Sequence, residues 1–153
     1  MANTYSQMYI QIIFSVKGRV NLIRKEFRDE LYKYIAGIIK NEKQKLLAIG
    51  GTADHIHIFI ALNPDKKLAD LVRVIKSNSS KFINEKKYIR GKFNWQEGYG
   101  AFSYAHSQKE TVINYVLNQE KHHTKKTFKE EYYKLLKLFE IGFDEKYLFD
   151  WID

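Results

Sequence analysis

The order in which short apolar runs and amphipathic segments alternate along the chain is the feature that most constrains its fold. Residues 9–16 are dense in β-branched and aromatic side chains and predict a strand. Apolar residues at helical spacing then predict a helix that ends near Asn41. The next two apolar runs, KLLAIGG and HIHIFIAL, predict an antiparallel strand pair, with Gly50 and Gly51 loosening the turn between them.

The second half of the chain continues this alternation. An apolar stripe with a period of 3.6 residues predicts a helix over residues 68–83. Residues 92–105 predict a fourth strand, broken around Gly98 and Gly100. The order strand, helix, strand, strand, helix, strand is that of a ferredoxin-like βαββαβ domain with an antiparallel sheet. We therefore expect an α+β fold and a single domain over residues 1–153.

Two more helices should follow the fourth strand as additions to the ferredoxin-like core. Ser107 with Glu110, and Thr127 with Glu130, have the spacing of a capping box, in which a hydroxyl and a carboxylate satisfy backbone donors at a helix start. The third helix is therefore predicted to open at Ser107. The fourth should run from Thr127 to about Ile141.

Charge and composition limit the classes of function. The formal net charge of +8 favours a polyanionic partner, either nucleic acid or an acidic membrane surface, and charge alone does not choose between them. Cysteine is absent, which excludes a disulfide framework, a thiol nucleophile and a thiolate zinc site. No apolar run approaches a membrane span, and the first residues lack the layout of a signal peptide. We expect a cytoplasmic protein that does not associate with membranes.

Two histidines separated by one isoleucine are the first candidate for chemistry. Alternation along a strand places His55, His57 and Phe59 on one face and the isoleucines between and beyond them on the other. Two neutral imidazoles on one strand face can bind one divalent ion, with oxygen atoms completing the site. Half-exposed histidines with ordinary hydrogen bonds would give the same pattern. Asp54, just before the pair, either orients an imidazole or is a turn residue.

A tyrosine on the third predicted helix is the second candidate. Tyr115, Gln119 and His122 fall within a narrow arc of that helix, whereas Ile113, Val116 and Leu117 should seat it on the core. A phenol, with a pKa of about 10, is a poor nucleophile at neutral pH unless a cation is nearby. If this helix crosses the histidine face, a metal-assisted attack on a phosphodiester becomes coherent, and it would leave a covalent phosphotyrosine. Such a protein could cut and reseal DNA without ATP.

These motifs together resemble those of the HUH-type transposases, the single-tyrosine enzymes of small insertion sequences that move as single-stranded DNA. DHIHIF resembles the metal motif of that family, WQEGYGAFSY the stretch before its catalytic helix, and YVLNQEKHH its tyrosine motif with glutamine four residues on. IKSNSSKFI is similar to its basic, serine-bearing segment. The resemblance covers most of the chain. One departure is Gln11, where relatives often carry histidine.

The resemblance implies a set of roles. Tyr115 would be the nucleophile, and His55, His57 and Gln119 would bind a divalent cation, Mg²⁺ or Mn²⁺. Asp54 and His122 would support that site from outside it. Cleavage at hairpin-flanked element ends would yield a 5′-phosphotyrosine and a free 3′-OH. Family members are homodimers in which the tyrosine helix of one subunit can complete the active site of the other. Domesticated relatives that process repetitive extragenic hairpins share the same residues.

Basic residues could hold the DNA phosphates, which would make affinity fall steeply with salt. Ordinary solvated side chains would have the same pattern. The candidates are Arg73, Lys76, Ser80, Lys81, Lys121, Lys125 and Lys126.

Two alternatives are non-catalytic. The first is an RNA-binding module, because Gly98, Tyr99, Gly100 and Tyr104 match part of the strand motif of RNA-recognition domains, although Glu97, Ala101 and Phe102 do not fit it. Trp95, Tyr99 and Phe102 would then stack on bases rather than pack in the core. The second is a catalytically silent metal sensor.

Overall fold

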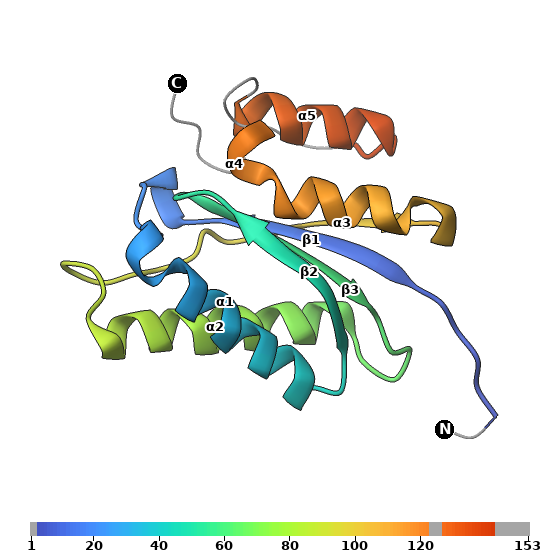
Figure 1. The fold of residues 1–153 in the computed structure, drawn as a ribbon, viewed down its shortest axis with the longest axis horizontal. Helices are drawn as coiled ribbons and strands as arrows, with labels where there is room; N and C mark the ends of the chain where they lie inside the picture. The colour runs from blue at the N-terminus through green and yellow to red at the C-terminus, as the bar shows by residue number, and fades with distance from the viewer. Residues whose placement is uncertain (1–2, 123–126, 143–153) are drawn as a thin grey trace.

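The structure, a computed structural model, describes residues 3–122 and 127–142 (Figure 1). Its strands are β1 (Tyr9–Ser15), β2 (Lys45–Gly51), β3 (His55–Ala61) and β4 (Gly100–Tyr104). Its helices are α1 (Lys25–Asn41), α2 (Leu68–Lys86), α3 (Lys109–Leu117), α4 (Gln119–His122) and α5 (Phe128–Leu138), with 3-10 turns at Lys17–Arg19 and His106–Gln108. Among these elements, no helix is long and apolar enough to cross a membrane.

The four strands form one antiparallel sheet in the order β2-β3-β1-β4. This order, with the two helical crossovers, confirms the predicted ferredoxin-like core. Cross-strand partners lie on the same face of a sheet. The register pairs Ile13 of β1 and Gly50 of β2 with His57. Residues of three strands are thereby brought to the face that carries the histidines.

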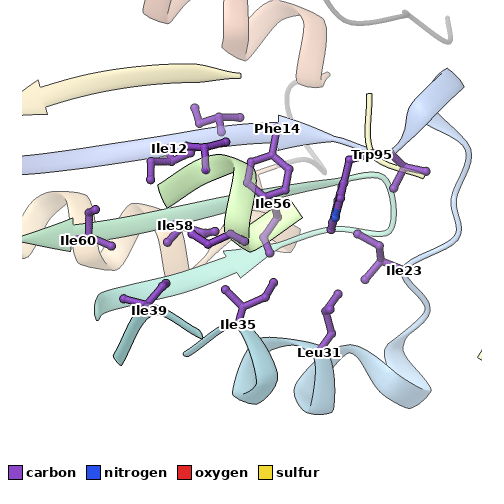
Figure 2. Packing of buried hydrophobic residues seen from close by; sticks show 14 of the residues in the cluster. Ile12, Phe14, Ile23, Leu31, Ile35, Ile39, Ile56, Ile58, Ile60 and Trp95 are labelled. Atoms are coloured by element: carbon purple, nitrogen blue, oxygen red, sulfur yellow. The ribbon is translucent and has the colours of Figure 1, made fainter. Parts of the chain in front are cut away.

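Helices cover both faces of the sheet (Figure 1). The isoleucines of β3 point toward α1 and α2, and Figure 2 shows them with Ile12 and Phe14 opposite Leu31 and Ile35 of α1. These side chains are almost fully buried, so they form the larger core. The alternation predicted for β3 is therefore confirmed.

The histidine face is covered by α3, α4 and α5 (Figure 1). Val112 and Val116 of α3 are buried against Phe59 of β3, which confirms that α3 crosses this face. Leu117, predicted to seat the helix, is instead 59% exposed, and Val112 takes that place. The predicted docking of the tyrosine helix is thus correct, although its apolar face is rotated from the predicted one.

The fourth strand and the last helix are shorter than the sequence predicts. The fourth strand is confined to Gly100–Tyr104, because Gly98 has a φ of +87° and only Trp95 of the preceding segment forms a β-bridge, to Val16. The last helix ends at Leu138 rather than near Ile141, because Glu140 adopts a left-handed conformation and the Ile141 N–H donates back to Leu136.

The two predicted capping boxes have different outcomes. At α5 the Thr127 hydroxyl accepts the Glu130 N–H at 3.1 Å, as predicted. Before α3, a 3-10 turn precedes the helix, and the Gln108 side chain accepts the Ala105 N–H at 3.0 Å. Gln108 thus takes the place predicted for Glu110, and the helical segment begins one residue before Ser107.

Candidate metal and nucleophile site

His55 is held by the turn that precedes it. Asp54 Oδ1 lies 2.8 Å from His55 Nδ1, and the Thr52 hydroxyl lies 3.0 Å from each of those atoms. A carboxylate oxygen can only accept, so Nδ1 carries the proton and Nε2 presents a lone pair. Burial lowers the pKa of His55 to about 4, which keeps this imidazole neutral at pH 7. Asp54 therefore lies where an orienting role would require it.

His57 is held in the same way from the neighbouring strand. Gln11 of β1 donates from Nε2 to the Tyr104 hydroxyl at 2.9 Å, which turns its Oε1 toward His57. That oxygen accepts the Nδ1–H of His57 at 2.7 Å. The His57 Nε2 atom is thereby directed away from β1. Gln11, the departure from the family pattern, orients the imidazole of His57.

Side-chain oxygen atoms of α4 and α5 lie close to the Nε2 atoms of both histidines. Glu131 Oε1 lies 3.2 Å from His57 Nε2 and 4.0 Å from His55 Nε2, and Gln119 Oε1 lies 3.4 Å from His55 Nε2. The donor atoms of His55, His57 and Glu131 all lie within 4.8 Å of one another, and the three side chains are buried. Nitrogen and oxygen lone pairs that converge in this way suit a divalent cation.

Tyr115 extends from α3 to the edge of this cluster. Its ring lies edge-on to His57, with centroids 5.8 Å apart, and its hydroxyl donates to Glu131 Oε2. Burial, followed by the negative charge and hydrogen bond of Glu131, raises the pKa of Tyr115. Without a cation the phenol is therefore held protonated.

The tyrosine helix is not continuous through Gln119, contrary to the predicted single arc. Asn118 leaves helical geometry at φ −107° and ψ 29°, and its side chain donates to the Asn114 carbonyl at 2.7 Å. Gln119 then starts α4, and its Nε2 donates to the Tyr115 carbonyl at 3.1 Å. The break leaves Gln119 Oε1 beside His55. The side chain of His122 lies outside the described part of the chain.

An ion pair with α1 anchors α4 on the other side. Arg28 is almost buried and donates through Nη2 to the Ile23 carbonyl at 2.8 Å. Its Nη1 donates to the carboxylate of Glu120, which lies next to Gln119. The position of Gln119 is therefore tied to the N-terminal half of the chain.

Glu131 is the site residue that sequence reasoning missed. It belongs to the stripe of α5 that packs on the sheet, together with Phe128, Tyr132 and Leu135, and it is 7% exposed. The Phe128 ring stacks on His55 with centroids 4.1 Å apart. An acidic residue within an otherwise apolar stripe was the available signal.

The predicted DNA-binding residues differ in their exposure to solvent. Lys76 is half-buried, and its amine donates to the carbonyls of Gln96 at 2.8 Å and Gly98 at 2.6 Å, while burial lowers its pKa to about 8. Arg73, Lys81 and Lys121 are exposed, Ser80 is partly buried, and Lys125 and Lys126 lie outside the described residues. In this structure Lys76 holds the loop that contains Gln96 and Gly98, and its contact with DNA stays a prediction.

The aromatic residues considered for base stacking also differ in their exposure to solvent. Trp95 and Phe102 are buried in the core, at 8% and 2% exposure, and only Tyr99 is substantially exposed. Both sheet faces are covered by helices (Figure 1). An RNA-recognition module needs an open sheet face for its stacking aromatics, so this arrangement disfavours that alternative.

The comparisons with known proteins agree with the geometry. A family model described as "Transposase IS200 like" matches residues 4–119. A crystal structure of a candidate transposase from Deinococcus radiodurans R1 aligns with a TM-score of 0.63 and 18% identity, over 76% of this chain and 94% of the other. A REP-associated tyrosine transposase bound to a REP hairpin aligns with a TM-score of 0.56 and 12% identity, over 74% and 67%. No curated protein sequence matches.

The family match places the protein among the transposases, and the two solved structures share its fold. Because the family model covers more than half of the chain, the protein belongs to the IS200-like transposase family, as the motifs predicted. The matched stretch ends at Gln119, so α5 and Glu131 lie beyond it.

Proposed function

We propose that this transposase cleaves and rejoins single-stranded DNA at hairpin-flanked ends, with Tyr115 as the nucleophile. The observation that carries the proposal is the convergence of the Tyr115 hydroxyl and the two histidine Nε2 atoms on one carboxylate, that of Glu131. The nucleophile and the candidate cation ligands thus occupy one site.

The residues that would hold the cation are His55 and His57 through Nε2, Gln119 through Oε1 and Glu131 through Oε1. Mixed nitrogen and oxygen ligands fit Mg²⁺ or Mn²⁺ better than a thiolate-preferring ion. A cation held by these residues would supply Lewis-acid chemistry, since it would polarise the phosphoryl group and offset developing negative charge. Asp54 and Gln11 keep both imidazoles in the tautomer that such binding needs.

In the cleavage step the phenolic oxygen of Tyr115 forms a bond to phosphorus while the bond from phosphorus to the 3′ oxygen breaks. The phenol loses its proton and the departing oxygen gains one, so the products are a 5′-phosphotyrosine and a free 3′-OH. In the rejoining step a 3′-OH attacks the phosphotyrosine and releases Tyr115. ATP is not needed, because the phosphotyrosine bond conserves the energy of the cleaved phosphodiester.

The test is a search for the covalent adduct. Single-stranded oligonucleotides that tile both strands flanking the gene are incubated with the protein and Mn²⁺ and resolved on a denaturing gel, and the modified peptide is identified by mass spectrometry. We expect an adduct on Tyr115 that disappears with EDTA and in Tyr115→Phe. Tyr99→Phe, which alters an exposed tyrosine of the loop before β4, is the matched control and should react normally. An adduct that survives Tyr115→Phe contradicts the assignment.

We further propose that the chain acts as one domain within a homodimer. In the structure the ring of Tyr115 lies edge-on to His57 of the same chain. In a dimer, Tyr115 could act with the histidines of its own subunit or with those of the other subunit. Mixing Tyr115→Phe protein with His57→Ala protein distinguishes these arrangements, because a site built within one subunit stays inactive in the mixture. Recovery of adduct formation would show that the sites are shared between subunits.

A further inference from the structure

Glu131 presents its two carboxylate oxygens to two different partners. Oε1 lies 3.2 Å from His57 Nε2, and Oε2 accepts the hydrogen bond of the Tyr115 hydroxyl. One carboxylate therefore spans the distance between the candidate cation site and the candidate nucleophile.

The helix that carries Glu131 is firmly docked on the histidine face. Phe128 stacks on His55, and Leu136 is 5% exposed. Tyr132 packs so closely on β4 that a Cβ atom at Gly100 would lie 2.6 Å from its hydroxyl. The backbone at Glu131 is thereby fixed with respect to both β3 and β4.

Glu131 Oε1 faces the Nε2 atoms of both histidines, at 3.2 Å from His57 and 4.0 Å from His55. Transfer of an ionised carboxylate to a buried site is strongly unfavourable unless it is paired or coordinates a metal. Both histidine Nδ1 protons are already donated, to Asp54 and to Gln11, so the neighbouring Nε2 atoms are acceptors rather than donors when the rings are neutral. A cation between Glu131 Oε1 and the two Nε2 atoms would be bound by a lone pair from each of the three side chains.

We propose that Glu131 is a ligand of the cation through Oε1 and a positioning residue for Tyr115 through Oε2. Helix α5 would then contribute a single carboxylate that contacts both the cation and the candidate nucleophile. The inference rests on the proposed function, and it adds a residue that lies beyond the stretch matching the family.

The ligand half of the proposal is tested without DNA. Mn²⁺ affinity is measured by titration calorimetry for the wild-type protein, Glu131→Gln and Glu130→Gln. Glu130 is the matched control because it occupies the same first turn of α5 and is exposed. We expect Glu131→Gln to weaken Mn²⁺ binding about 10- to 100-fold and Glu130→Gln to leave it unchanged. Equal affinities for all three proteins would overturn the ligand assignment.

The positioning half is tested by the Cζ resonance of Tyr115 in protein labelled with ¹³C at that carbon, assigned by its absence in Tyr115→Phe. We expect Glu131→Ala to shift this resonance and Glu130→Gln to leave it in place. Where Glu131→Ala fails to fold, Glu131→Gln provides the measurement. An unmoved resonance would overturn the positioning role.

Single-turnover kinetics link both halves to the reaction. With an oligonucleotide that reacts with the wild-type protein, Glu131→Gln should lower the rate constant of adduct formation about 10- to 100-fold while oligonucleotide affinity stays unchanged. A normal rate constant in Glu131→Gln overturns the inference and leaves the proposed function intact. If no oligonucleotide reacts with the wild-type protein, the proposed function fails, and the Mn²⁺ and resonance measurements still decide the placement of Glu131.

Discussion

Gly50 lets the tyrosine helix approach the sheet, so substitution at this position should separate the parts of the site. A Cβ atom at Gly50 would lie 2.1 Å from the Val116 carbonyl oxygen and 3.1 Å from its carbon. Ordinary contact begins at 3.4 Å, so α3 has to withdraw by roughly 1.3 Å. Since Val116 follows Tyr115, the phenol moves with it. The loosened turn that the sequence suggested at Gly50 is in fact a helix-packing position within β2.

Two quantities should change in Gly50→Ala. Overpacking against a backbone atom lowers the free energy of unfolding by about 1–3 kcal/mol, and misplacement of a reacting group by about 1 Å reduces the reaction rate on the order of 100-fold. Urea denaturation measures the first and single-turnover adduct formation the second. Gly37→Ala is the control, because Gly37 is an exposed residue of α1 with nothing within 4 Å of an added Cβ. It should stabilise the protein by about 0.5–1 kcal/mol and leave the rate unchanged.

The outcome that refutes this reasoning is a Gly50→Ala protein with wild-type stability and wild-type rate. That result would mean that α3 does not pack against β2 as closely as the structure shows. A loss of stability with a normal rate would contradict the proposed link between the position of α3 and the reaction of Tyr115.

Three further predictions concern the supports of the site. Glu120→Ala removes the ion partner of the buried Arg28 and should lower the free energy of unfolding by about 1–3 kcal/mol in urea denaturation. The control is Glu110→Ala, which alters an exposed residue in the first turn of α3 and should change the free energy of unfolding by no more than about 0.5 kcal/mol. Equal losses in the two variants would contradict the role of the ion pair. The pKa of about 4 for His55 lies below that of the unfolded chain, which therefore binds the proton first. The metal-free protein should thus lose up to about 3 kcal/mol as the pH falls from about 6.5 to 4, and an unaltered pH profile in His55→Gln would refute this. Asp54→Asn should weaken Mn²⁺ binding about 10- to 100-fold in a calorimetric titration, and a normal affinity would show that Asp54 does not orient the imidazole.

The core fold was predictable because its signals are local. The period of two in HIHIFIAL, which assigns His55 and His57 to one face, and the helical periods around it depend only on neighbouring residues. The short connection between β2 and β3 accounts for their pairing, and the crossovers through α1 and α2 account for the positions of β1 and β4. Tyr115 could be selected as a candidate nucleophile because its motif is contiguous in sequence.

The remaining parts of the site depend on long-range packing. Glu131 reaches the histidines only because α5 docks on the sheet, and no local period specifies where a terminal helix docks. The function of Gly50 depends on a backbone that is distant in sequence, and this contact leaves no local pattern.

Anomalous diffraction from crystals grown with Mn²⁺ tests the central claim most directly, because it locates the ion without reference to activity. We expect one strong peak within coordination distance of His55 Nε2, His57 Nε2 and Glu131 Oε1, with the Tyr115 hydroxyl beside it. Strong peaks elsewhere, with none between the histidines and Glu131 in either subunit of a dimer, would contradict the account.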